Sequence, residues 1–296
     1  MQNFISKNNT SVAIQGIKAS FHEEAARLFF EGNGESGNYF GDGGNIEVVP
    51  SRTFSNLFSA VKESRADYGI CAFENSLAGS ILPNYALLRN TDLEIFGEVY
   101  LCIEMQLMAL PGQRIEEIQE IHSHPMALLQ CRGYLDGLGD VQLVESTDTA
   151  SSAMEIREGN IHNRAAIAGR RAAEEYGLEI IAADIHDNKR NFTRFLTIGR
   201  KGQHPVAENI DKASISFRAS HAPGSLAKIL TIIGDHGINM NKIQSLPVIG
   251  EEWRYYFYVD LRFEDYDNYR KMLETIGPLT DDLMVLGEYA QASRPV

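Results

Sequence analysis

The pattern of apolar and polar positions changes about two thirds of the way along the chain. Before that point, short apolar runs alternate with segments whose apolar residues recur at helical spacing. This alternation predicts βα units and predominantly parallel sheets, because a helix between two strands returns the chain to the same direction. The expected strands are 11–15, 46–49, 68–73, strand segments within 93–110, 118–123, 141–145, 165–168 and 195–199, and the expected helices are 23–30 (opening at Ser20), 51–63, 81–89, one beginning near 125, 149–158 and 170–176.

The last third of the chain has the pattern of a small α+β unit. Residues 214–218 alternate between apolar and polar, as a half-buried strand does. After Pro223 a helix is expected, because its apolar positions follow the i, i+3, i+4, i+7 rule. The elements that follow are the strand 238–243, the strand 255–262, the helix 267–276 and the strand 283–289. The order βαββαβ is the ferredoxin-like arrangement.

The two patterns are separated by a polar segment at 201–212, which we interpret as a linker. The sequence therefore predicts a larger α/β domain at 11–200 and a smaller domain at 213–291. A chain of 296 residues suits two or three units of ordinary size.

Composition and charge exclude several classes of function. A formal net charge of −13 disfavours nucleic-acid binding, which needs a basic face to displace counterions. No run approaches the ~20 apolar residues that span a bilayer, so no membrane partner is expected. The polar start of the chain predicts no secretory signal. Three widely spaced cysteines, an odd number, favour reduced thiols and a cytoplasmic location.

Polar clusters follow several predicted strands, where open α/β sheets place ligands. The first spans 16–22, where backbone N–H groups and the Ser20 hydroxyl could hold an anion, although Ser20 could equally be an ordinary helix N-cap. The second spans 74–80, where Asn75 and Ser76 could donate to substrate oxygens and Glu74 could act as an acid or base if shielded from water. A solvent-facing turn is the alternative for this cluster.

Three further clusters come later in the chain. In 123–131, His124 could be an acid–base group or a helix cap, while Ser123 and Gln130 could face a cleft. The cluster 147–150 could be only a cap. In 191–195, the guanidinium of Arg194 beside the Thr193 hydroxyl suits carboxylate recognition, and either a structural or a ligand carboxylate must meet it. No metal-ligand spacing, P-loop or GxGxxG motif is present, so no cofactor is expected.

Taken in order, these motifs resemble the prephenate dehydratase family over about 11–289. The family's Gly–Ser/Thr–aromatic–Ser/Thr segment is approximated by 16–22, with His22 in place of the second hydroxyl. Its Glu-Asn-Ser segment matches 74–76, and its Ser-His-Pro-Gln … Gln-Cys segment matches 123–131, with Met126 in place of a glutamine. Its Thr-Arg-Phe signature matches 193–195. The set in this order is highly specific, whereas each motif alone is weak.

The resemblance implies a two-lobed catalytic domain similar to type 2 periplasmic binding proteins, followed by an ACT domain. It implies a carbon–oxygen lyase that converts prephenate to phenylpyruvate in phenylalanine biosynthesis. Carried over by position, the catalytic residues are Asn75, Ser123, Gln130 and Thr193. The supporting contacts are Arg194, Ser20 and Ser76, with Glu74 as a possible acid. Thr193 is expected to stabilise the departing hydroxyl by donation rather than by full proton transfer.

The resemblance also implies that the ACT domain binds phenylalanine as a feedback inhibitor. The family's Gly-Ala-Leu landmark reads 224–226 here, and its Glu-Ser-Arg-Pro landmark reads 244–247, with Gln244 and Leu246 in place of two charged residues. Backbone N–H groups at this helix start suit an amino-acid carboxylate. The expected effector residues are Pro223, Gly224, Ser225, Leu226, Gln244 and Ser245. A purely structural dimerisation module is the alternative.

Three other functions compete with prephenate dehydration. Arogenate dehydratase performs the same elimination on an amino-bearing substrate, and the motifs do not separate the two. A non-catalytic small-anion binding protein with an ACT sensor is a second alternative, and an ACT-containing transcription regulator, which here lacks a basic helix-turn-helix, is a third. An ACT domain also leads us to expect a homodimer or homotetramer.

Overall fold

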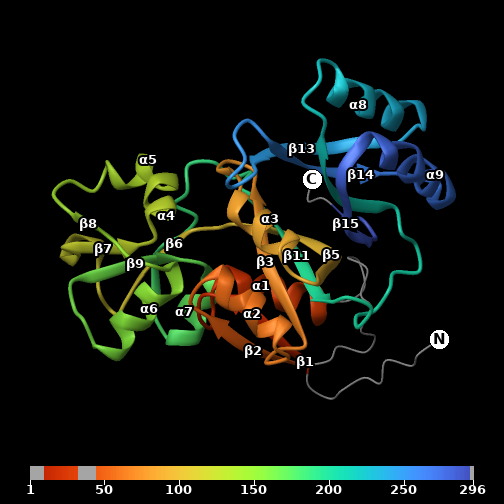
Figure 1. Cartoon of the computed structure of the whole chain (residues 1–296). Helices are drawn as coiled ribbons and strands as arrows, with labels where there is room; N and C mark the ends of the chain where they lie inside the picture. The colour runs from red at the N-terminus through yellow and green to blue at the C-terminus, as the bar shows by residue number, and fades with distance from the viewer. Residues whose placement is uncertain (1–9, 33–44, 294–296) are drawn as a thin grey trace.

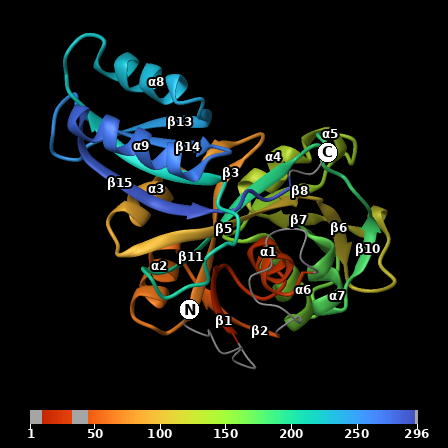
Figure 2. The same cartoon turned by 90° about the vertical axis from the view of Figure 1, so that its right-hand side faces the viewer.

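The computed structural model describes residues 10–32 and 45–293, and the polar start of the chain lies outside these ranges. The described residues form two α/β lobes and a C-terminal α+β domain (Figure 1). The second lobe lies to one side of the first, and the C-terminal domain lies above the first lobe in this view. Figure 2 shows the same three parts from the side. No helix in the described part of the chain has the length and apolar content needed to cross a membrane.

The first lobe is built on five neighbouring strands in the order β2-β1-β3-β11-β5. β1 pairs in parallel with β2 and β3, whereas β11 runs antiparallel to β3 and β5. The strands are β1 (Thr10–Gln15), β2 (Ile46–Ser51), β3 (Tyr68–Asn75), the short β4 (Gly79–Ser80), β5 (Leu93–Cys102) and β11 (Phe192–Arg200), and the helices are α1 (Phe21–Phe30), α2 (Phe54–Lys62) and α3 (Leu82–Arg89).

The second lobe has a five-stranded sheet in the order β10-β6-β9-β7-β8, of which β7 pairs in parallel with β8 and β9. The chain enters this lobe after β5 and leaves it into β11, so the first lobe is made of two separate segments. The strands are β6 (Gln106–Ala109), β7 (Glu120–Ser123), β8 (Gln142–Glu145), β9 (Arg164–Ala168) and β10 (Glu179–Ala182), and the helices are the 3₁₀ turn η1 (Ile115–Glu117), α4 (Pro125–Gln130), α5 (Arg132–Leu135), α6 (Thr149–Glu158) and α7 (Arg170–Tyr176).

The C-terminal domain has an antiparallel sheet in the order β13-β14-β12-β15, with both helices packed over one face (Figures 1 and 2). This order is that of a ferredoxin-like βαββαβ unit. Its elements are β12 (Lys212–Ala219), α8 (Ser225–Asp235), β13 (Asn239–Pro247), β14 (Tyr255–Arg262), α9 (Tyr266–Ile276), the 3₁₀ turn η2 (Gly277–Leu279) and β15 (Thr280–Tyr289).

A single strand contact joins the C-terminal sheet to the first lobe. β15 pairs in parallel with β5 at Gly287 and Ile95, which makes one ten-stranded sheet of the two parts. A Cβ at Gly287 would overlap the carbonyl oxygen of Ile95 and lie 2.6 Å from its Cβ. Glycine is therefore needed at this position for the two strands to approach each other.

Two predictions about the fold need correction. The sheets are mixed rather than predominantly parallel, because β11 and β6 run against their neighbours. The predicted helix 51–63 begins only at Phe54, since Ser51 still belongs to β2 and Thr53 caps the helix through its side chain. The strand β10 was not predicted. In the predicted linker, His204 is buried and stacks on Phe96, so this segment packs on the first lobe.

Candidate active site

A cavity of about 430 Å³ opens between the two lobes. Residues of both lobes and of the crossing strand β11 line it, which places it in the cleft of a two-lobed binding fold. The lining residues are Gln15, Ser20, Phe21, His22, Phe54, Ala72, Asn75, Ala78, Ile81, Ile103, Met105, His124, Met126, Ala127, Gln130, Thr147, Asp148, Thr149, Thr193 and Phe195.

The polar centre of this cavity is a pair of residues on neighbouring antiparallel strands. Thr193 on β11 is the register partner of Asn75 on β3, and Nδ2 of Asn75 donates to Oγ1 of Thr193 at 3.0 Å. Oδ1 of Asn75 accepts from the backbone N–H groups of Leu77 and Ala78, at 3.0 and 2.9 Å. These bonds fix the orientation of the amide, so the Thr193 oxygen is used as an acceptor and its own proton remains available for donation.

A third amide connects this pair to the second lobe. Asn191 is fully buried just before β11, accepts from Nδ2 of Asn75 at 2.8 Å and donates to Oε1 of Gln130 at 3.0 Å. Gln130 ends helix α4 of the second lobe. Asn191 was not predicted as a site residue, although it stands in the polar cluster 191–195. The three amides form a continuous hydrogen-bonded chain across the floor of the cleft.

Three helices begin at the cleft. Ser20 caps α1 by accepting from the Glu23 N–H, His124 caps α4 through Nδ1, and Asp148 caps α6. All three caps line the cavity. Helix N-termini carry a partial positive charge and attract anions. Of the described residues, none that lines this cavity is arginine or lysine, so an anionic ligand here would meet helix N-termini instead of guanidinium or ammonium groups.

The remaining wall is apolar and includes a neutral histidine. His22 is buried, its Nε2 accepts from the Ala72 N–H at 3.3 Å, and its ring meets Phe195 edge-on with centroids 5.0 Å apart. Burial lowers the pKa of His22 to about 3, so the ring is uncharged near neutral pH. Together with Phe54, at 5.7 Å between centroids, it forms an aromatic surface that suits a flat, carbon-rich ring.

Two predicted site residues, Ser123 and Ser76, do not line this cavity. Ser123 is fully buried and donates to the carbonyl oxygen of Ile167 at 2.6 Å. Ser76 is exposed, accepts from the Phe192 N–H at 2.9 Å and donates to the Arg190 carbonyl at 3.3 Å. Both hydroxyls therefore support the chain segments that carry site residues.

Arg194 and Glu74 face away from the cleft, on the side of the C-terminal domain. Arg194 is 4% exposed, and its guanidinium binds Glu98 (2.6 Å), Asp260 and the Tyr289 hydroxyl (2.9 Å). Burial alone would lower the pKa of Arg194, but the charges of Asp260 and Glu98 raise it well above its ordinary value. The sequence predicted that either a structural carboxylate or a ligand carboxylate would pair with Arg194. The geometry favours structural carboxylates, those of Glu98 and Asp260. Glu74 pairs with Lys242 at 3.2 Å.

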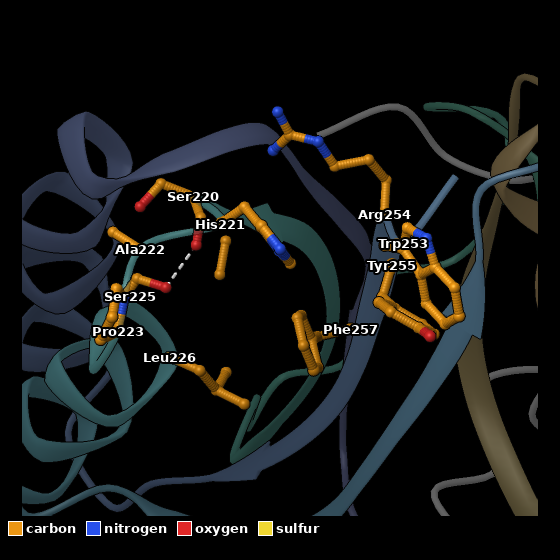
Figure 3. Close-up of a pocket in the computed structure, with 11 residues that line it drawn as sticks. Ser220, His221, Ala222, Pro223, Ser225, Leu226, Trp253, Arg254, Tyr255 and Phe257 are labelled. Atoms are coloured by element: carbon orange, nitrogen blue, oxygen red, sulfur yellow. Dashed lines mark hydrogen bonds between the residues drawn. The ribbon is translucent and has the colours of Figure 1, made fainter. Parts of the chain in front are cut away.

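A second cavity, of about 380 Å³, lies in the C-terminal domain (Figure 3). Figure 3 shows the loop before α8 on one side and the side chains of Trp253, Tyr255 and Phe257 on the other. Pro223, Ser225 and Leu226, three of the residues predicted to bind an effector, line it. Gly224 caps α8 in a left-handed conformation with φ 80° without lining the cavity.

Gln244 and Ser245 also lie outside the lining of this second cavity. Nε2 of Gln244 donates to the Ser245 carbonyl at 3.2 Å. Leu246 is the register partner of Tyr256 and packs on the apolar cluster that includes Tyr85 of the first lobe. The residue that replaces the family's arginine therefore contributes to contact between domains.

Comparison with known protein families gives two matches. Residues 12–203 match the prephenate dehydratase family model, and residues 213–265 match the ACT domain model. The chain is 35% identical to a bifunctional chorismate mutase/prephenate dehydratase of Aquifex aeolicus (strain VF5), over 95% of this chain and 74% of that protein. It is 36% identical to the chloroplastic arogenate dehydratase/prephenate dehydratase 2 of Arabidopsis thaliana, over 94% of this chain and 72% of that protein.

Two solved structures have the same architecture over nearly their whole length. A prephenate dehydratase from Arthrobacter aurescens in complex with L-Phe superposes with a TM-score of 0.82, at 26% identity, covering 97% of this chain and 92% of that one. GqqA, described as a novel type of quorum quenching acylase, gives a TM-score of 0.81 at 29% identity, covering 95% of this chain and 98% of that one.

Proposed function

Because the chain belongs to the prephenate dehydratase family, we propose that it catalyses the decarboxylating dehydration of prephenate to phenylpyruvate in phenylalanine biosynthesis. The observation that carries this proposal is the Thr193 hydroxyl on the cleft floor, held by the amide of Asn75 at 3.0 Å. Membership of the family adds the reaction class, a carbon–oxygen lyase.

Prephenate carries two carboxylates and a ring hydroxyl, and the cleft offers a partner for each kind of group. The N-termini of α1 and α4, marked by Ser20 and His124, present backbone N–H groups and partial positive charge to an anion. The aromatic surface of His22, Phe54 and Phe195 suits the cyclohexadiene ring. A substrate carboxylate and the substrate ring would therefore bind to different walls of the cleft. This arrangement orients the ring towards β11.

The reaction breaks two bonds at opposite ends of the ring. The carbon–carbon bond to the ring carboxylate breaks and releases carbon dioxide, and its electron pair enters the ring. The carbon–oxygen bond at the opposite ring carbon breaks as hydroxide leaves, and the hydroxide takes a proton to become water. Donation from Thr193 Oγ1 stabilises the negative charge that develops on the leaving oxygen, as preorganised donors do for other developing oxyanions.

Asn75 and Asn191 keep that donor oriented. Because Nδ2 of Asn75 already donates to the Thr193 oxygen, the hydroxyl proton is directed elsewhere, towards the cavity. We do not assign Glu74 as the acid, since its carboxylate is paired with Lys242 of the C-terminal domain. We assign the final proton to bulk solvent, reached through water in the cleft, because a single water that gave up its proton would itself be left as hydroxide.

L-phenylalanine is the proposed effector, and the cavity of Figure 3 is its proposed site. Phe257, Tyr255 and Trp253 supply an aromatic wall for the ring of the effector, and the loop before α8 supplies polar groups for its ammonium and carboxylate. The structural relative from Arthrobacter aurescens was solved with L-Phe. Inhibition of this chain by phenylalanine is part of the proposal.

Arogenate is a second candidate substrate, and one residue favours it. Arogenate replaces the keto group of prephenate with an ammonium, which needs an acceptor. Asp148, whose carboxylate caps α6, is the acidic side chain among the residues that line the cavity in the described part of the chain. A relative from Arabidopsis thaliana is named for both substrates.

We also propose a cytoplasmic homodimer or homotetramer. Exposed apolar side chains of the C-terminal domain support assembly: Ile249 is 98% exposed and Trp253 is 73% exposed. Such side chains are commonly covered in an oligomer. The three free cysteines support a reducing compartment.

One assay tests the enzymatic proposal. Purified protein is incubated with prephenate or arogenate, and formation of phenylpyruvate or phenylalanine is followed with and without added L-phenylalanine. We expect turnover of prephenate that phenylalanine reduces. Turnover of neither substrate would reject the proposed activity, and a rate on prephenate that phenylalanine leaves unchanged would reject the proposed feedback. Sedimentation of the same sample measures the oligomeric state.

A further inference from the structure

A buried ionic cluster joins the C-terminal domain to the strand that carries Thr193. Arg194 binds Asp260 of β14 and Glu98 of β5. Asp260 also accepts from Ser214 at 2.6 Å, and Glu98 is held by Lys212 at 2.8 Å. All of these side chains are at most 4% exposed, so they depend on one another for compensation of charge.

The strand β14 connects this cluster with the cavity of the C-terminal domain. Tyr255 and Phe257 line that cavity, and Val259 continues the same face into the core beneath the helices. Asp260 lies on the opposite face, next to the first lobe. Because successive side chains of a strand point to opposite faces, a shift of β14 caused at Phe257 also moves Asp260.

On the other side of the cluster, β11 connects Arg194 with the catalytic floor. Thr193 points into the cleft and Arg194, the next residue, points to the C-terminal domain. The pairing of β11 with β3 shifts register between Arg194 and Phe195. A change in the position of Arg194 therefore changes the position of Thr193 against Asn75.

We infer that Asp260 is a positioning residue for the dehydration reaction. By binding Arg194, it lets the ACT domain set the place of the Thr193 hydroxyl, and it is the contact through which a ligand in the ACT cavity alters turnover. This inference rests on the proposed function, which nowhere assigns Asp260 a role.

The substitution Asp260→Asn separates this role from that of a structural residue. Asparagine has the same shape and can still accept from Ser214, while Arg194 keeps Glu98 and Tyr289 as partners. The change removes the charge that holds Arg194 on the side of β14. Asp235→Asn makes the same chemical change at an exposed position near the end of α8 and is the matched control.

Four quantities are measured on full-length protein: kcat, KM, the inhibition of kcat by phenylalanine, and the thermal unfolding temperature. Phenylalanine binding is followed separately through the fluorescence of Trp253, the single tryptophan, which lines the ACT cavity. For Asp260→Asn we expect kcat to fall roughly tenfold while KM stays within about twofold of wild type. A misplaced Thr193 hydroxyl stabilises the transition state less but leaves substrate binding nearly unchanged. Phenylalanine should still bind but inhibit less. Asp235→Asn should behave as wild type.

Hydrogen exchange of the segment 191–196 gives a readout that does not need activity. We expect faster exchange there in Asp260→Asn and wild-type exchange in Asp235→Asn. A wild-type kcat for folded Asp260→Asn, or undiminished inhibition by phenylalanine, would overturn the inference. If wild-type protein turns over neither substrate, the proposed function is rejected. In that case, hydrogen exchange at 191–196 that is the same in Asp260→Asn and wild type rejects the role of Asp260 separately. If the wild-type enzyme is active but phenylalanine does not inhibit it, the kcat and KM of Asp260→Asn still test whether Asp260 positions Thr193.

Discussion

Asn75 and Thr193 face each other across two antiparallel strands, and the amide of Asn75 donates to the Thr193 hydroxyl at 3.0 Å. Asn75 cannot turn away, because its own oxygen accepts two backbone N–H groups. Thr193 is 8% exposed and lines the cleft. A prealigned donor of this kind lowers the reorganisation needed when charge develops on a leaving oxygen.

Replacement of Thr193 by valine is predicted to lower kcat by roughly 10²–10³-fold, as for loss of a single preorganised donor. Valine keeps the side-chain volume, so the unfolding temperature should change by only a few degrees. Thr193→Ser retains the hydroxyl and should recover a large part of the rate. Steady-state kinetics with prephenate check this, and near-wild-type turnover of Thr193→Val would remove Thr193 from the mechanism.

Asn191 is predicted to control activity through the two amides that it connects. In Asn191→Ala, Asn75 loses its 2.8 Å partner and Gln130 its 3.0 Å partner, so the Gln130 amide can rotate and the hydrogen-bonded chain between the two lobes is broken. Loss of this alignment should lower kcat/KM roughly a hundredfold, the cost of a misplacement of about 1 Å.

Asn188→Ala is the control for Asn191, because Asn188 is an exposed asparagine three residues earlier on the same segment. Its activity should stay within about twofold of wild type. Equal kinetic effects at both positions would mean that the segment, rather than the amide chain, matters.

Much of the fold could be predicted because periodicity reflects burial directly. The helix 149–158 and the strand 255–262 have the predicted bounds. Strand direction was not predictable in this way, since the alternation of β11 is the same whether it runs with or against β3. The short β10 was not predictable in this way, because its four residues, Glu179–Ala182, do not alternate between apolar and polar.

The site was harder to predict, for reasons that differ by residue. The alternation of strand side chains separates Thr193 from Arg194, and it could have assigned Arg194 to the far side of the sheet. The depth of Ser123 depends on packing against Ile167, far away in the sequence. Asn191 has no motif of its own. Its role comes from the meeting of two lobes, which a local pattern does not describe.

His22 is predicted to make the free energy of unfolding depend on pH. Its folded pKa of about 3 lies below its ordinary value of 6.5, so the folded state disfavours the protonated ring. The stability that depends on the neutral ring is complete above pH 6.5 and is lost as the pH falls towards 3. At pH 5 the loss should be about 2 kcal/mol.

Urea unfolding at pH 7 and pH 5 measures this dependence. In His22→Gln, glutamine can accept from the Ala72 N–H but does not titrate, so the variant should lose about 2 kcal/mol less than wild type between the two pH values. Comparing the two proteins cancels the contribution of groups that titrate in both. Identical losses would show that His22 takes up its proton in the folded state without cost.

Gly287 is predicted to hold the ACT sheet against the first lobe. In Gly287→Ala the new Cβ would overlap the Ile95 carbonyl, so β15 and β5 must move apart at their single register pair. Overpacking of this kind costs about 1–3 kcal/mol, and urea unfolding should show that loss. The ionic cluster of Arg194 connects the same two domains, the C-terminal domain and the first lobe. Inhibition of turnover by phenylalanine should therefore weaken as well.

Gly234→Ala is the matched control for the Gly287 prediction. Gly234 lies within helix α8, and a Cβ there would have open space around it. Alanine is favoured over glycine at a helical position, and Gly234 is the penultimate residue of α8, so this variant should gain up to about 0.5–1 kcal/mol in the free energy of unfolding. Opposite signs for the two variants would locate the effect in the contact between β15 and β5. A loss of equal size in both would instead indicate that the ACT domain tolerates no added methyl group, and the role of Gly287 as a spacer between domains would be rejected.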